Sequence, residues 1–87
     1  MSALPDVREV TVNYFAAARA AAGTATERVE AGNLGELIAA AGQRHGPGLA
    51  KVLGVCSFLI DGVRVSDQDA ALPAGSSVDV LPPFAGG

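Results

Sequence analysis

The stretch VREVTVNYF, residues 7–15, alternates between apolar and polar side chains along its length. Val10, Val12 and Tyr14 fall on one face, and polar residues fall between them. A period of two residues with β-branched side chains predicts a strand that buries one face. The stretch SVDVL, residues 77–81, repeats the pattern, so a strand is predicted near each end of the chain.

Between these two strands the sequence predicts one main helix. Asn33, followed three residues later by Glu36, resembles a capping box at a helix N-terminus. Glycine and proline at residues 46–47 should end this helix. Residues 16–23 are interpreted as a turn or a single helical turn, and residues 48–54 as a second short helical turn. The apolar stripe at helical spacing consists of Leu34, Leu37, Ile38 and Ala41.

Three more strands complete the predicted sheet. Residues 24–30 are expected to pair antiparallel with the first strand, and residues 55–60 and 63–65 to form a hairpin around Asp61-Gly62. One main helix over one face of a mixed sheet of about four or five strands is an economical two-layer arrangement. The first and last strands would then lie side by side and parallel at the centre. This α+β arrangement is the β-grasp, or ubiquitin-like, fold.

The composition excludes several classes of function. The chain of 87 residues carries a net charge of -3 and scattered basic residues, so it lacks the basic patch of a nucleic-acid or anionic-membrane binder. No apolar run approaches the ~20 residues of a transmembrane helix, and no signal peptide is recognised at the start. We therefore expect a cytoplasmic protein with neither nucleic acid nor a membrane as partner.

Cys56 is the only cysteine, and it predicts neither a nucleophile nor a metal site. One cysteine cannot form an internal disulfide and cannot alone hold zinc or an iron–sulfur cluster. Its register with Phe58 and Ile60 predicts a small buried hydrophobe that lies far from the tail. His45, which follows Arg44, is interpreted as a cation near the C-terminal dipole of the helix.

The last residues, LPPFAGG at 81–87, differ in composition from a passive polar linker. Pro82 and Pro83 favour an extended geometry that projects the chain away from the sheet. Phe84 is an apolar side chain from which a monomer gains little, which indicates a partner pocket. These three residues are therefore candidate partner contacts.

The tail ends in residues with almost no side chain. Ala85 and Gly86 can thread a channel that is too narrow for larger residues. The α-carboxylate of Gly87 is ionised at neutral pH and becomes reactive if an enzyme converts it to an acyl adenylate. We therefore divide the chain into a β-grasp domain, residues 1–81, and an extended Gly-Gly tail, residues 82–87.

Three stretches resemble the ubiquitin-like sulfur-carrier proteins of molybdopterin and thiamin biosynthesis, and most of all the small subunits of molybdopterin synthase. They are VNYFAAARAAAG at residues 12–23, FLIDGVRV at residues 58–65 and LPPFAGG at residues 81–87. The resemblance extends over essentially the whole chain, and the tail is its most specific part. Phe84 departs from the smaller aliphatic residue that is more usual in the family.

This resemblance implies a carrier that is not itself an enzyme. A ubiquitin-activating-like adenylyltransferase would use ATP to adenylate the Gly87 carboxylate. A sulfur donor such as a cysteine desulfurase or a rhodanese-type protein would then replace AMP and leave a thiocarboxylate. The tail would enter the large catalytic subunit of a heterotetrameric synthase and donate sulfur to cyclic pyranopterin monophosphate. The carrier itself would bind no cofactor and no metal.

The sheet face away from the helix is a candidate docking surface. Phe15, Leu59 and Leu81 are out of register with the core residues, so they are its candidate members. Their interpretation as ordinary, partly exposed strand residues is equally open. Carriers for thiamin or cysteine biosynthesis and ubiquitin-like modifiers end in the same Gly-Gly, so both are alternatives, as is an interaction module whose tail is incidental.

Overall fold

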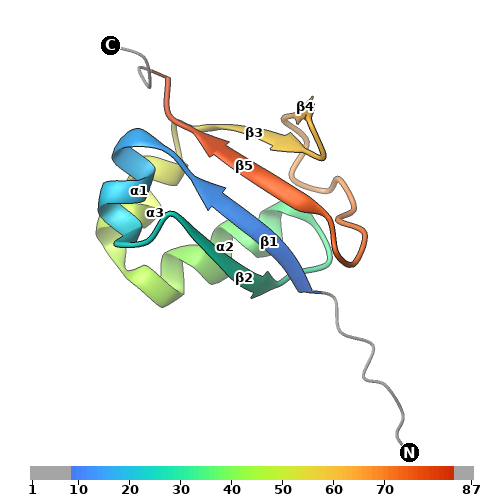
Figure 1. Ribbon diagram of the computed structural model, residues 1–87, viewed down its shortest axis with the longest axis horizontal. Coiled ribbons are helices and arrows are strands. Elements are labelled where there is room, and N and C mark those ends of the chain that lie inside the picture. Colours follow the sequence, from blue (N-terminus) through green and yellow to red (C-terminus); the bar gives the residue numbers. More distant parts are fainter. Residues whose placement is uncertain (1–8, 84–87) are drawn as a thin grey trace, which may run out of the picture.

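The computed structural model describes residues 9–83, which form five strands and three helices (Figure 1). Residues 1–8 and 84–87 lie outside the described part. The elements in chain order are β1 (Glu9–Tyr14), α1 (Ala16–Ala22), β2 (Thr26–Glu30), α2 (Leu34–His45), α3 (Pro47–Leu53), β3 (Ser57–Ile60), β4 (Val63–Val65) and β5 (Ser77–Leu81).

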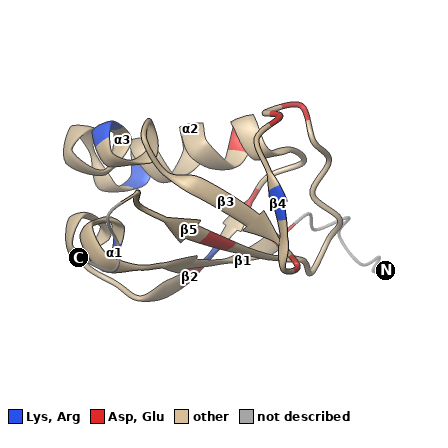
Figure 2. Ribbon diagram, turned by 90° about the horizontal axis from the view of Figure 1, so that it is seen from above, with Lys and Arg blue, Asp and Glu red and all other residues tan. Residues whose placement is uncertain are grey.

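The strands form one mixed sheet in the order β2-β1-β5-β3-β4. The strands β1 and β5 lie parallel at its centre, with Val12 beside Val78 and Tyr14 beside Val80. The other neighbouring strands run antiparallel. Figure 2 shows α2 and α3 together on one side of the sheet. The molecule therefore has the β-grasp, or ubiquitin-like, fold, and the predicted fold class is confirmed.

The core lies between one face of the sheet and the helices. Side chains alternate between the two faces of a strand, so every second residue of β1 and β5 is buried against the helix layer. From the predicted stripe of α2, Leu34, Leu37 and Ala41 are buried, and Ile38 packs at the margin of the core. The buried strand residues include Val10, Val12, Tyr14, Val78 and Val80.

The two ends of α2 follow the signals predicted from the sequence. The Glu36 N–H donates to the Asn33 Oδ1 at 2.8 Å, and the Gly32 N–H donates to the Glu36 Oε1 at 2.7 Å. The first bond satisfies an amide that the helix N-terminus leaves without an intrahelical partner. At the other end Gly46 has a φ of 96°, a value that favours glycine. Pro47 then begins α3, where its missing N–H is not needed.

The two short helical connectors lie where they were predicted, but each forms about two helical turns in place of one. The helix α1 has seven residues, and Gly23, with a φ of 77°, closes it by donating its N–H to the Arg19 carbonyl at 2.9 Å. Alanine has the highest helix propensity, and burial of Ala18 and Ala22 adds tertiary packing. The helix α3 also has seven residues and packs against both other helices. The main helix is therefore one of three in the described residues.

The strands β2 and β3 each start two residues later than predicted, at Thr26 and Ser57. The N–H groups of Val55 and Cys56 donate back to carbonyls of α3 at 3.1 and 3.3 Å, so both residues belong to the turn that follows this helix. A short apolar run does not by itself distinguish a strand from such a turn. The sequence pattern therefore placed the turn residues in the strand.

Candidate functional site at the end of the sheet

The last strand leaves the sheet at its centre. Because β5 runs parallel to β1, the carboxyl ends of both strands lie at the same end of the sheet (Figure 1). The Phe15 N–H donates to the Val80 carbonyl at 3.2 Å, which fixes the residue after β1 beside the end of β5. The chain therefore continues into Pro82 and Pro83 at the centre of the sheet. We call these two residues the tail root.

The sheet face away from α2 and α3 carries the predicted docking residues. The pairing of β3 with β5 places Leu81 opposite Ser57 and Leu59 opposite Asp79, so the two leucines are diagonal neighbours on that face. Phe15 follows the buried Tyr14 in extended conformation, so it lies on the same outer face. Phe15 is 42% exposed. We call these three residues, Phe15, Leu59 and Leu81, the outer patch.

A polar pair of contacts lies beside the outer patch. The Asn13 amide donates to the Ser77 Oγ at 3.0 Å and to the Asp79 Oδ1 at 2.9 Å. These bonds join the outer sides of β1 and β5 and orient the Asp79 carboxylate. An apolar patch with a polar border is the usual anatomy of a protein–protein contact surface.

On the helix side, the tail root borders an apolar groove that sequence reasoning missed. Pro82 is buried and Pro83 is exposed, and both line this groove of about 340 Å³. The turn after α3 contributes Val55, which is 64% exposed. The other lining residues are Ala16, Ala17 and Val52. The apolar side chain of Val55 could have indicated this groove, but the sequence analysis assigned residue 55 to the strand over residues 55–60.

Cys56 lies beside the tail root rather than far from it, so that prediction was wrong. It immediately precedes Ser57, which pairs with Leu81 at the end of β5. Its thiol donates to the Val52 carbonyl at 3.2 Å, and burial raises the pKa of this thiol. The protonated form is a poor nucleophile. Cys56 packs against the core, as predicted, and offers no activated sulfur.

The remaining predicted residues of the tail, Phe84, Ala85, Gly86 and Gly87, lie outside the described residues. Within residues 9–83, no group of three or more His, Cys, Asp or Glu side chains could hold a metal ion. Also within this part of the chain, no helix is long and apolar enough to cross a membrane.

A polar cluster lies at the same end of the sheet, on the helix side. The Tyr14 hydroxyl donates to the Glu27 Oε2 at 2.6 Å, and the His45 Nε2 lies 2.7 Å from the same oxygen. The Arg44 Nη1 lies 3.2 Å from the Glu27 Oε1 and donates to the Arg28 carbonyl at 2.9 Å. The cluster therefore ties the C-terminal end of α2 to β1 and β2.

The cluster shifts the pKa of two of its members. Burial raises the pKa of Tyr14, and the hydrogen bond to Glu27 raises it further. Burial alone would raise the pKa of Glu27, but hydrogen bonds from its three partners outweigh burial and lower this pKa. His45 thus makes a specific contact with a carboxylate in addition to the predicted interaction with the helix dipole.

The fold and the tail root define the class of protein: a ubiquitin-like β-grasp protein whose sequence continues from the central strand into a Gly-Gly tail. The chain belongs to the ThiS family, whose model matches residues 12–87. The match includes the end of β1, all of β5 and the tail sequence. We therefore regard the chain as a member of the ubiquitin-like sulfur carriers and modifiers.

Solved structures support the same assignment. SAMP1 from Haloferax volcanii is 26% identical, with a TM-score of 0.77, over 91% of this chain and 99% of that one. Subunits 1 and 2 of molybdopterin-converting factor from Helicobacter pylori form a complex in which the matched chain is 26% identical, with a TM-score of 0.67, over 91% of this chain and 99% of that one.

Small archaeal modifier protein 1 from Methanosarcina acetivorans has a TM-score of 0.80 at 23% identity, over 93% of this chain and 98% of that one, and it shows the fold alone. No curated protein sequence matches the chain closely enough to count as a relative.

The lowered pKa of Glu27 predicts a specific loss of stability in acid. A carboxyl group with a lower pKa in the folded state stabilises the fold fully above its ordinary pKa of 4.5, and this contribution falls as the pH decreases through the lower folded-state value. Urea unfolding at several pH values should show that wild type loses stability below that pH faster than Glu27→Gln. If the free energy of unfolding changed with pH in the same way for both proteins, the stabilising role of ionised Glu27 would be contradicted.

Proposed function

We propose that this chain is the sulfur-carrier subunit of a molybdopterin synthase and acts in the cytoplasm. The observation that carries the proposal is that the central strand β5 of a ThiS-family chain leads into Pro82 and Pro83 beside the outer patch and the apolar groove. The structural similarity to a subunit of molybdopterin-converting factor supports the choice of pathway.

The reacting group in this proposal is the carboxylate of Gly87. A ubiquitin-activating-like adenylyltransferase supplies ATP, the carboxylate attacks its α-phosphate, and pyrophosphate leaves. A sulfur donor, such as a cysteine desulfurase or a rhodanese-type protein, then attacks with the terminal sulfur of its persulfide and displaces AMP. A second thiol cleaves the resulting acyl disulfide, is itself oxidised to a disulfide with the donor, and releases the thiocarboxylate. The thiocarboxylate donates its sulfur to cyclic pyranopterin monophosphate. In this proposal the carrier needs no cofactor of its own, because its partners supply the ATP, the sulfur and the acceptor that react with or through the Gly87 carboxylate.

In this proposal the β-grasp domain supplies the surface to which the partner proteins bind. We propose that the outer patch, together with Pro82, Pro83 and Phe84, docks on the large catalytic subunit, and that Ala85 and Gly86 thread its entrance. Two carriers on a dimer of large subunits would give a heterotetramer. An extended tail of six residues from Pro82 reaches about 20 Å, which is enough to enter a closed pocket.

A ubiquitin-like modifier is the second candidate. The similarity to SAMP1 of Haloferax volcanii favours it, since that protein matches over most of both chains. A modifier would use the same adenylated Gly87 but would pass it to a lysine amine instead of a sulfur donor. A carrier for thiamin or cysteine biosynthesis differs only in the acceptor that consumes the sulfur.

Removal of Gly87 is the direct test of the reacting group. The carrier, activated with ATP, adenylyltransferase and sulfur donor, is mixed with a molybdopterin synthase large subunit, and the dithiolene product is measured. We expect the full chain to give product and the chain that lacks Gly87 to give none while retaining its fold by circular dichroism. Full activity of the shortened chain would show that Gly87 is not the reacting group. Absence of product from the full chain would contradict the assignment to molybdopterin synthase.

A charge on the outer patch tests the docking surface. Phe15→Glu should weaken binding to the large subunit by about tenfold or more, because a buried aromatic contact is replaced by a desolvated charge. Ala39→Glu, on the exposed side of α2, adds the same charge on the other side of the molecule and should bind as wild type does. Calorimetry gives both affinities. Equal effects of the two substitutions would place the docking surface elsewhere.

A further inference from the structure

The strand β4 forms one edge of the sheet. On the side away from β3, its backbone has N–H and C=O groups that can pair with another strand. It pairs with β3 through Ile60 opposite Val63, Leu59 opposite Arg64, and Phe58 opposite Val65. The two-residue turn between the strands has a positive φ at both positions, 48° at Asp61 and 86° at Gly62. Such a turn is flanked by a hydrogen-bonded pair, so the next pair along the hairpin is not hydrogen-bonded.

Arg64 belongs to that second pair, so its N–H and C=O point away from β3. The pairing of β3 with β5 agrees with this register. The Asp61 N–H donates to the Ser77 carbonyl at 2.8 Å, so the odd-numbered residues of this hairpin arm form the hydrogen bonds to β5. Leu59 therefore directs its backbone groups toward β5 and not toward Arg64. The backbone of Arg64 is thus free to pair with a further strand.

The side chains of β4 divide between the two faces of the sheet. Arg64 is exposed on the outer face beside Leu59, and it has no ion-pair partner in residues 9–83. Val63 lies on the helix side and is 64% exposed. Val65, two residues further on the same side, packs against the core. An added strand would therefore meet a positive charge between two apolar positions.

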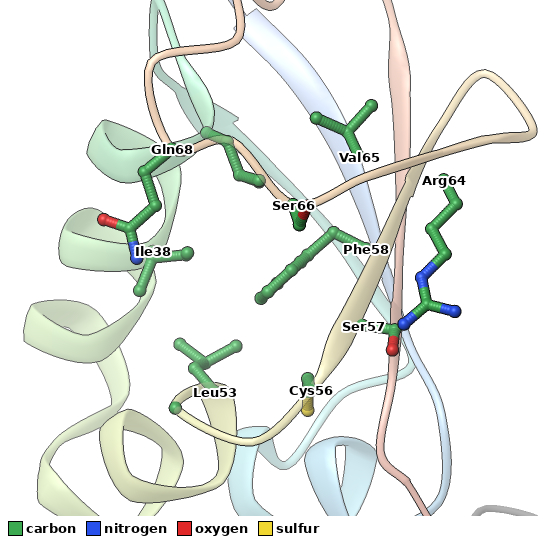
Figure 3. Close-up of a pocket in the computed structure, with 11 residues that line it drawn as sticks. Ile38, Leu53, Cys56, Ser57, Phe58, Arg64, Val65, Ser66 and Gln68 are labelled. Carbon is green, nitrogen blue, oxygen red and sulfur yellow. The ribbon is translucent and has the colours of Figure 1, made fainter.

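A pocket lies beside the end of β4 (Figure 3). It has a volume of about 250 Å³ between α2 and the β3–β4 hairpin. Phe58, Ile38 and Leu53 point into it in Figure 3, whereas the Arg64 side chain points away toward Ser57. The pocket can receive an apolar side chain on the helix side of the sheet.

A second copy of this chain is a poor occupant of the edge. Antiparallel pairing of two β4 strands about their centres would place two Arg64 side chains directly opposite each other, and like charges at such positions are destabilising. The β2 edge differs, because the Arg44 Nη1 already donates to the Arg28 carbonyl there at 2.9 Å. An acidic group on an added strand would instead complement the positive charge of Arg64.

We propose that β4 binds an extended segment of a partner protein as an additional strand. The segment has an acidic residue that faces Arg64 and an apolar residue on each side of it. One apolar residue covers Val63, and the other lies beside Val65 at the pocket. Main-chain hydrogen bonds to Arg64 supply affinity, and the alternating side chains supply specificity. This site goes beyond the proposed function, since it uses the unpaired edge of β4, whereas the proposed docking of the large subunit uses the tail root and the outer patch.

Peptide titration of the full, isotope-labelled chain tests the proposal by NMR. The probe is the peptide acetyl-Thr-Val-Glu-Val-Thr-amide, and its partner probe has lysine in place of glutamate. We expect saturable amide shifts that centre on Arg64, with weaker binding of the lysine peptide. The variant Arg64→Glu should bind the glutamate peptide about threefold to tenfold more weakly than wild type and should prefer the lysine peptide.

The exchange of preference is the decisive result, because a merely structural role of Arg64 would not produce it. Arg19→Glu, an exposed position of α1, makes the same change in net charge and should leave binding of both peptides as in wild type. A well-dispersed spectrum establishes that each variant is folded. Absence of saturable shifts in β4, equal binding of both peptides to wild type, or shifts centred on the outer patch would each overturn the proposal.

Discussion

The parallel pairing of β1 with β5 is the constraint on which the rest of the structure depends. Parallel neighbours require a long crossover, and the residues between β1 and β5 supply it as three helices and three strands. The same pairing brings the carboxyl ends of both strands to one end of the sheet. The tail root therefore lies at the centre of the sheet, with Phe15 on one side of it and the turn after α3 on the other.

The polar cluster around Glu27 stabilises this arrangement from the helix side. A carboxylate buried without partners would be costly, but Glu27 accepts hydrogen bonds from β1 and from the end of α2. Tyr14, the strand member of the cluster, is the residue directly before Phe15. The contacts that join α2 to β1 through Glu27 thus also position Tyr14, the residue next to Phe15 of the outer patch.

The sequence alone predicted the elements whose signals are local and periodic. Strict alternation in β1 and β5, the cap formed by Asn33 and Glu36, and the Asp61-Gly62 turn each appear where expected. The errors concern features that depend on tertiary packing. Residues 16–22 form a helix of two turns, in which Ala18 and Ala22 are buried, and Val55 belongs to a turn because its N–H bonds back to α3. The contact between His45 and Glu27 joins residues far apart in the chain, so no short motif announces it.

The outer patch was predicted from register, and the groove was not. Phe15, Leu59 and Leu81 follow directly from strand periodicity once the core face is assigned. The groove instead assembles residues from α1, from the turn after α3 and from the tail root, so it exists only in the folded chain. This division explains why the sequence predicted the members of the outer patch but not the groove on the other side of the tail root.

The central claim is that the C-terminal carboxylate of Gly87 carries sulfur. The most direct measurement is the intact mass of the protein isolated from its native host, followed by fragmentation of its C-terminal peptide. We predict a mass increase that matches replacement of one oxygen by sulfur, located on Gly87. A Gly87 found only as the free carboxylate, or only in amide bonds to lysine side chains of other proteins, would contradict this claim.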